Sequence, residues 1–74
     1  MTEISQKIVL YTTTNCSACD RARAELVRDG VEFEERNVMA KKDWYDEVLK
    51  YSISVPVLLR DGKAEVRRGG CLIF

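Results

Sequence analysis

Histidine is missing from all 74 residues of the sequence. This absence excludes Cys–His pairs and Ser–His–Asp triads as catalytic machinery, because both depend on an imidazole base. It also excludes every metal site that has a histidine ligand. The chemistry of this chain therefore has to be sought among its other residue types.

Long apolar runs and an excess of charge of one sign are missing as well, and we expect no leader segment. The longest apolar runs have four or five residues, far below the roughly 20 that span a membrane. Twelve basic residues balance twelve acidic ones, so nothing suggests a nucleic-acid or membrane-surface partner. Residues 1–7 have neither the basic nor the apolar region of a signal peptide. We expect a cytoplasmic protein with no membrane partner, in a compartment that keeps idle thiols reduced.

The length and composition are those of one small globular domain. A chain of 74 residues has room for a single domain, which we take as residues 1–74. Its hydrophobic share of 46% and charged share of 32% are ordinary for such a domain. A core of this size stabilises the fold by only a few kcal/mol.

Two of the three cysteines, Cys16 and Cys19, lie where a predicted strand gives way to a predicted helix. Unpaired N–H groups and partial positive charge at a helix start favour a thiolate, which is the reactive form. Residues three apart on a first helical turn are also close enough to form a disulfide. The pattern predicts a reversible dithiol pair, in which a solvent-facing Cys16 attacks a disulfide and Cys19 releases the product.

Hydrophobic periodicity predicts alternating strands and helices in the order β-α-β-α-β-β. Strands are expected at residues 7–11, 31–38, 57–60 and 64–68, and helices at residues 16–29 and 40–51. Two crossover connections would make the first three strands parallel. We therefore expect an α/β domain with a mixed four-stranded sheet and a helix on each face.

Single residues mark several of the expected boundaries. Asn15 is placed as an N-cap and Gly30 as a C-terminal stop for the first helix, and Asp43 could cap the second helix or support its first turn. Asp61-Gly62 predicts a two-residue hairpin. Residues 52–56 are expected to form a loop, and residues 69–70 to end the last strand.

Three stretches together resemble the glutaredoxins, which have a thioredoxin-like fold. Residues 16–26 are similar to the family's CxxCxxAKxxL, residues 54–56 to its TVP with a cis-proline, and residues 69–71 to its GG and GGC turn. Most members carry a further C-terminal helix, which this chain does not supply. Ser17 and Ala18 stand where CPYC is usual, and Leu72 and Ile73 stand where an acidic residue is common.

The resemblance implies a thiol–disulfide oxidoreductase that reduces protein or glutathione mixed disulfides through Cys16 and Cys19. Its electrons would come from glutathione or from a flavoprotein such as thioredoxin reductase. Glutathione would be a co-substrate, with no bound cofactor and no metal, and the protein a monomer or weak homodimer. The implied substrate or glutathione contacts are Tyr11, Thr13, Ser17, Val55, Pro56, Gly69, Gly70 and Cys71. A cis bond before Pro56 would aim the Val55 backbone at a peptide-like ligand added as a strand.

Other readings of these residues remain open at this point. Two thiolates suit Cu(I), and Cys16 could hold an iron–sulfur cluster across a dimer, so metal handling is the alternative function. The last four residues match a prenylation box at Cys71, although the GGC resemblance accounts for that cysteine. Trp44, Tyr45 and Tyr51 lie at helical spacing and are read as core. Lys63, Arg67 and Arg68 are read as a solvated edge strand.

The apolar ending is expected to cover part of the sheet. A chain without a final helix leaves strand residues beside the first helix exposed, namely Ile8, Leu10, Phe33 or Leu58. We expect Leu72, Ile73 and Phe74 to fold back beside that helix, or a second subunit to share the patch.

Overall fold

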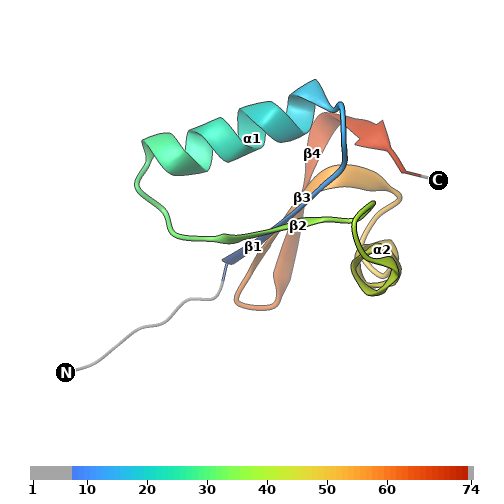
Figure 1. Cartoon of the computed structure of the whole chain (residues 1–74). Helices are drawn as coiled ribbons and strands as arrows, with labels where there is room; N and C mark the ends of the chain where they lie inside the picture. The colour runs from blue at the N-terminus through green and yellow to red at the C-terminus, as the bar shows by residue number, and fades with distance from the viewer. Residues whose placement is uncertain (1–7, 74) are drawn as a thin grey trace.

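The computed structural model describes residues 8–73, apart from the side chains of residues 67 and 68. Expectations for residues 1–7, for Phe74 and for the Arg67 and Arg68 side chains fall outside this range. The elements are β1 (Ile8–Thr12), α1 (Ser17–Arg28), β2 (Glu34–Asn37), α2 (Lys42–Leu49), β3 (Ser54–Arg60) and β4 (Lys63–Leu72). The expected order β-α-β-α-β-β is confirmed, in a thioredoxin-like arrangement (Figure 1).

The four strands form one mixed sheet in the order β2-β1-β3-β4. β1 is parallel to β2, whereas β3 is antiparallel to both of its neighbours, β1 and β4. The expectation that β3 would be parallel to β1 is wrong. A parallel crossover needs a connection that returns along the full strand, but α2 has only eight residues and is seen nearly end-on beside the sheet in Figure 1. The chain therefore enters β3 at the end where it left β1.

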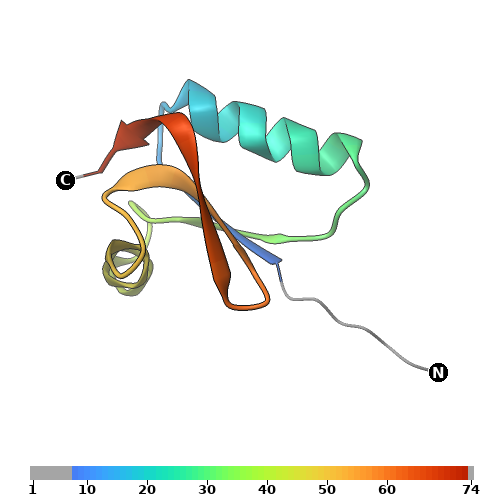
Figure 2. The ribbon, with the colours of Figure 1, turned by 180° about the vertical axis from the view of Figure 1, so that it is seen from behind.

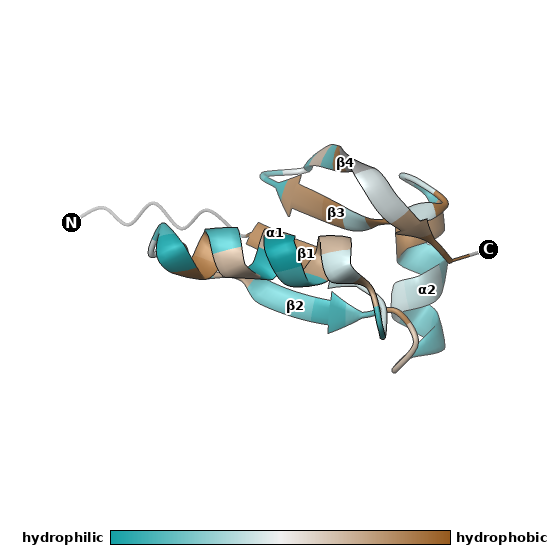
Figure 3. Cartoon of the chain, turned by 90° about the horizontal axis from the view of Figure 1, so that it is seen from above, coloured by the Kyte–Doolittle hydropathy of each residue, from teal (hydrophilic) through white to brown (hydrophobic). Residues whose placement is uncertain are grey.

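The alternation of β1 divides the core into two clusters, one on each face of the sheet. Ile8 and Leu10 face α1, where they pack with Ala22, Leu26 and Leu58. Val9 and Tyr11 face the other way, in a cluster that includes Val48 of α2 and Val57 of β3. All five residues of β1 are buried, as expected for the central strand of a two-faced sheet. Seen from above, α1 lies over β1 (Figure 3).

The β3–β4 hairpin is longer than the sequence predicts. Asp61 and Gly62 have φ values of 51° and 84°, so the expected two-residue turn is confirmed. β3 starts at Ser54, inside the expected loop, and β4 continues past the glycines to Leu72. An irregularity between Val55 and Val57 absorbs the change of register, so the glycines do not end the strand. Figure 2 shows this long edge strand from behind.

One expected helix cap is corrected, and the expected place of Asp43 in the first turn of α2 is confirmed. Cys16, not Asn15, is the N-cap of α1, and it makes no side-chain capping hydrogen bond. Asn15 instead has a φ of 59° in the loop, a conformation that asparagine tolerates better than most residues. Lys41 is the N-cap of α2, and Asp43 lies in its first turn. Gly30, at a φ of 71°, follows the end of α1 as expected.

The described part of the apolar ending, Leu72 and Ile73, does not cover the α1 face. Ile8, Leu10 and Leu58 are buried on that face without these two residues, and Leu72 is 70% exposed. Ile73 instead packs against the cluster on the α2 face, where its carbonyl oxygen accepts a hydrogen bond from the Tyr45 hydroxyl at 3.1 Å. Ile73 therefore connects the end of β4 to α2, which corrects the placement expected for this residue.

Two of the three aromatic residues of the second helical stretch belong to the core. Trp44 and Tyr45 are partly buried against the α2-face cluster, as expected, but Tyr51 is 43% exposed.

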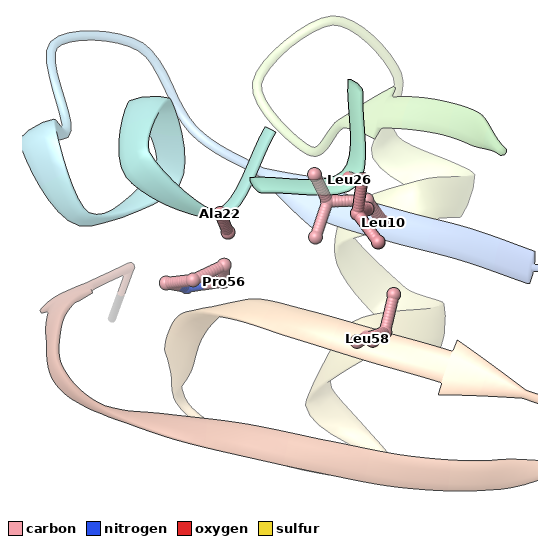
Figure 4. A pocket seen from close by; sticks show the side chains of 5 residues that line it. All are labelled: Leu10, Ala22, Leu26, Pro56 and Leu58. Carbon is pink, nitrogen blue, oxygen red and sulfur yellow. The ribbon is translucent and has the colours of Figure 1, made fainter. Parts of the chain in front are cut away.

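On the α1 face, five apolar side chains line a small hollow between α1 and the sheet: Leu10, Ala22, Leu26, Pro56 and Leu58 (Figure 4). Neither helix of the described chain is long and apolar enough to cross a membrane.

Candidate active site

Three cysteines meet where β1 ends and α1 begins. Cys16 is the N-cap of α1, Cys19 follows in the first turn, and Cys71 comes from the end of β4. Cys16 is bonded to Cys71 in a disulfide, with their Cα atoms 6.1 Å apart, and Cys19 is a free thiol. The expected disulfide between Cys16 and Cys19 is therefore not the one that forms here. The partner comes from 55 residues away, and no local spacing could have shown it.

The three sulfur positions differ in their access to solvent. Cys16 is only 1% exposed and Cys19 is fully buried, whereas Cys71 is partly exposed. The expectation that Cys16 faces solvent is wrong in this disulfide-bonded state. The end of β4 lies against the start of α1 and is held there by the bond, which is why Cys16 is covered.

Burial dominates the chemistry of Cys19. Removal from water disfavours the thiolate and raises the pKa of Cys19, and the nearby Asp20 and Glu35 carboxylates act in the same direction. A backbone hydrogen bond from Thr13 and the positive charge of Arg23 oppose them without outweighing the burial. Thr13, expected as a ligand contact, therefore contacts the buried thiol through its backbone.

A charged network joins α1 to β2 beside this thiol. Arg23 donates to both carboxylate oxygens of Glu35, at 2.7 and 2.6 Å, and to Asp20 at 2.9 Å. Thr12 donates to Glu35 at 3.0 Å. The guanidinium is the main reason why the pKa of Glu35 lies below its ordinary value. No sequence pattern pointed to Glu35, because only the packing of α1 against the sheet brings this residue to Arg23.

The Val55–Pro56 bond is cis, as expected, and both side chains are buried. Val55 lies in register with Cys71 of the neighbouring strand. Gly70 is packed so closely that a Cβ atom there would collide with the carbonyl oxygen of Val55. β4 of the chain itself therefore occupies the edge where we expected a peptide-like ligand to add as a strand.

The remaining expected contacts lie at different distances from the disulfide. Ser17 follows Cys16 and is exposed, and Gly69 is exposed with a φ of 73°. Tyr11 is buried on the α2 face, and its hydroxyl donates to Glu47 at 3.0 Å. Burial and Glu47 raise the pKa of Tyr11. The structure thus brings Ser17, Gly70 and Cys71 close to Cys16, but turns Tyr11 into the core.

Fold and site together define a thiol-redox protein of the thioredoxin-like class. The glutaredoxin family model matches residues 8–65, so the chain belongs to the glutaredoxin family. It is similar to the Gene 56 protein of Mycobacterium phage L5, with 34% identity over 73% of this chain and 54% of that protein. It is also similar to the global transcriptional regulator Spx 2 of Bacillus anthracis, with 30% identity over 80% of this chain and 42% of that protein. The chain thus spans about half the length of these curated relatives.

Proposed function

We propose that this protein is a thiol–disulfide oxidoreductase that reduces protein disulfides or glutathione mixed disulfides through Cys16. The gathering of three cysteines at the start of α1, beside a cis-proline, is the observation that supports this proposal most. Family membership supports thiol chemistry in general.

Cys16 is the nucleophile in this proposal because of its place at the start of α1. The N–H groups of the first turn and the positive end of the helix favour its thiolate once the disulfide is reduced. The thiolate attacks one sulfur of a substrate disulfide and forms a mixed disulfide. A second thiol then attacks the Cys16 sulfur and releases the reduced substrate. The CSAC spacing indicates Cys19 as the attacking thiol of this second step, and glutathione could attack in place of Cys19.

The electron donor in this proposal is glutathione or a flavoprotein reductase, which implies a reducing compartment such as the cytoplasm. Ser17 and Gly69 are exposed and Gly70 is partly exposed, and these residues near the disulfide would contact the incoming thiol or disulfide. No cofactor needs to be bound for this exchange, because the two electrons reside in the cysteine sulfurs.

A coupled turnover assay tests the proposal. The protein is mixed with bis(2-hydroxyethyl) disulfide and either glutathione with its reductase or thioredoxin reductase, and NADPH consumption is followed. We expect turnover with one donor system and its loss in Cys16→Ser, because serine cannot form the mixed disulfide.

The matched control is Ala24→Ser, which adds the same hydroxyl to an exposed position of α1. It should keep full turnover. Absence of turnover with both donors would contradict the proposal. It would favour a regulatory role without turnover, which the name of the Bacillus relative raises.

Metal handling, by Cu(I) or an iron–sulfur cluster, is the alternative that the CxxC spacing raises. Within residues 8–73, no three cysteine or carboxylate side chains are grouped so that they could hold a metal ion. An absorption spectrum after anaerobic purification tests this alternative, because a cluster or bound copper would give the protein a metal-dependent absorption.

A further inference from the structure

Cys71 is the partner of Cys16 in the disulfide, and the residues around Cys71 favour a specific role for it. Cys71 lies in β4 directly opposite Val55, the residue before the cis-proline. At this edge a peptide-like ligand would pair as an added strand and present a sulfur to Cys16. Cys71 does both from within the chain. Its strand pairs with β3 at Val55, and its sulfur is bonded to the Cys16 sulfur.

Several contacts hold Cys71 at this position. Gly70 lies against the carbonyl group of Val55 with no room for a side chain. On the other side, the Ile73 N–H donates to the Ile53 carbonyl oxygen at 3.0 Å, and Tyr45 binds the Ile73 carbonyl oxygen. The cysteine is therefore anchored on both sides, which keeps its sulfur within reach of Cys16 and reduces the entropy lost on bond formation.

Cys19 is less suited to the same step. It is fully buried in the α2-face cluster, whereas Cys71 is partly exposed. Burial also raises the pKa of Cys19, so less of it is present as the thiolate that attacks.

We infer that Cys71, rather than Cys19, is the thiol that resolves the mixed disulfide on Cys16. This inference rests on the proposed function. The Cys16 thiolate attacks a substrate disulfide, forms a bond to one sulfur and expels the other as a thiolate. The Cys71 thiolate then attacks the Cys16 sulfur, the bond to the substrate breaks, and the second substrate sulfur leaves as a thiolate that takes up a proton. Cys16 and Cys71 end as the disulfide, having supplied two electrons, and two external thiols later reduce it.

The experiment compares reduced wild type, Cys71→Ser and Cys19→Ser after mixing with one equivalent of bis(2-hydroxyethyl) disulfide. Samples are quenched with acid, alkylated and digested with trypsin without reduction. Cys16 and Cys19 fall in one peptide, residues 8–21, and Cys71 falls in another, residues 69–74. A bond inside the first peptide is thus distinguished by mass from a bond between the two.

We expect wild type and Cys19→Ser to yield the linked pair of peptides. Cys71→Ser should accumulate the hydroxyethyl adduct on Cys16 and resolve it at least about ten-fold more slowly. Cys71→Ala is a second variant for this step, and circular dichroism of the reduced proteins checks that each is folded.

Two results would overturn the inference, and they can be told apart. A bond within residues 8–21 in wild type, with the adduct accumulating in Cys19→Ser instead, would assign resolution to Cys19 and leave the proposed function intact. Failure of Cys16 to form any adduct, in wild type and in both variants, would overturn the proposed function as well.

Discussion

At the scale of single residues, the three cysteines divide into a disulfide-bonded pair and a buried free thiol. Cys16 and Cys71 share a disulfide at the start of α1, and Cys71 provides its exposed side. Cys19 lies one helical turn deeper and is fully buried. Both cysteines of the CxxC are therefore buried, and only Cys71 gives the disulfide an exposed side.

The buried thiol should be slow to react. In the disulfide-bonded protein, Cys19 is the cysteine with a free thiol, so iodoacetamide reports on it directly. Because burial raises the pKa of Cys19, less thiolate is present at any pH than in the unfolded chain. The pH midpoint of alkylation in the native protein should exceed the about 8.5 of an ordinary thiol, and the rate at pH 8 should be lower.

The same protein in guanidinium chloride is the reference for this measurement. Equal midpoints and equal rates in the native and denatured protein would show that Cys19 is not buried in solution.

At the scale of elements, α1 is connected to the sheet by side chains as well as by packing. Leu26 and Ala22 bury the inner face of the helix, and Arg23 reaches across to Glu35 of β2. This pair lies next to Cys19 and holds the first half of α1 against the edge strand. It is partly exposed at both ends, so its contribution to stability is modest.

Replacing the Glu35 carboxylate should reveal how much the Arg23–Glu35 pair stabilises the fold, because this stabilisation depends on pH. The pKa of Glu35 is lowered in the folded state, so its stabilisation is present above the unfolded value of about 4.3 and is lost as the pH falls through the folded value. We expect Glu35→Gln to lower the free energy of unfolding at pH 7 by about 1 kcal/mol or less. The difference from wild type should shrink below pH 4, as measured by urea denaturation.

Arg28→Ala is the matched control, because its ion pair with Asp29 is exposed and 3.6 Å long. It should leave the stability unchanged at both pH values. A Glu35→Gln effect that is constant from pH 7 to pH 3 would contradict the assigned role of the charge.

Much of this element structure could be predicted from the sequence, and the exceptions have identifiable causes. The strands and helices and the Asp61-Gly62 turn follow local patterns, and the cis bond before Pro56 was implied by the family resemblance. The direction of β3 does not, because it depends on how the short α2 lies against the sheet. The length of β4 was also not predicted, because an irregularity in the pairing between Val55 and Val57 lets the strand continue through its glycines.

At the scale of the whole molecule, one disulfide bond joins an early helix to the last strand. The disulfide links the start of α1 to the end of β4, across 55 residues of sequence. The edge strand β4 is thereby attached to α1, in addition to its pairing with β3. Closing a loop of this length restricts the unfolded chain much more than the folded one.

Reduction should therefore destabilise the protein measurably. A disulfide of this span contributes about 2–4 kcal/mol, which for a domain of this size corresponds to about 8 °C or more in Tm. We expect differential scanning calorimetry to show a lower Tm for the reduced wild type than for the oxidised form.

The cysteine variants show which bond is responsible for the shift. Cys19→Ser should retain the dependence of Tm on oxidation, because it keeps both partners of the bond. Cys71→Ser should lose that dependence. A shift that survives in Cys71→Ser would mean that Cys16 has another partner in solution.

The sequence by itself determined the family, the order of the elements and the place of the chemistry. Those features depend on local signals: hydrophobic periodicity, turn residues and a cysteine at a helix start. Only the tertiary structure decided that Cys71 is the partner of Cys16, that Cys19 is buried and that β4 occupies the edge at Val55. The place of Cys71 and of β4 depends on strand pairing between segments far apart in the chain, because a residue's neighbours across a sheet are set by register and not by sequence distance. The burial of Cys19 depends on how α1 packs against the rest of the fold.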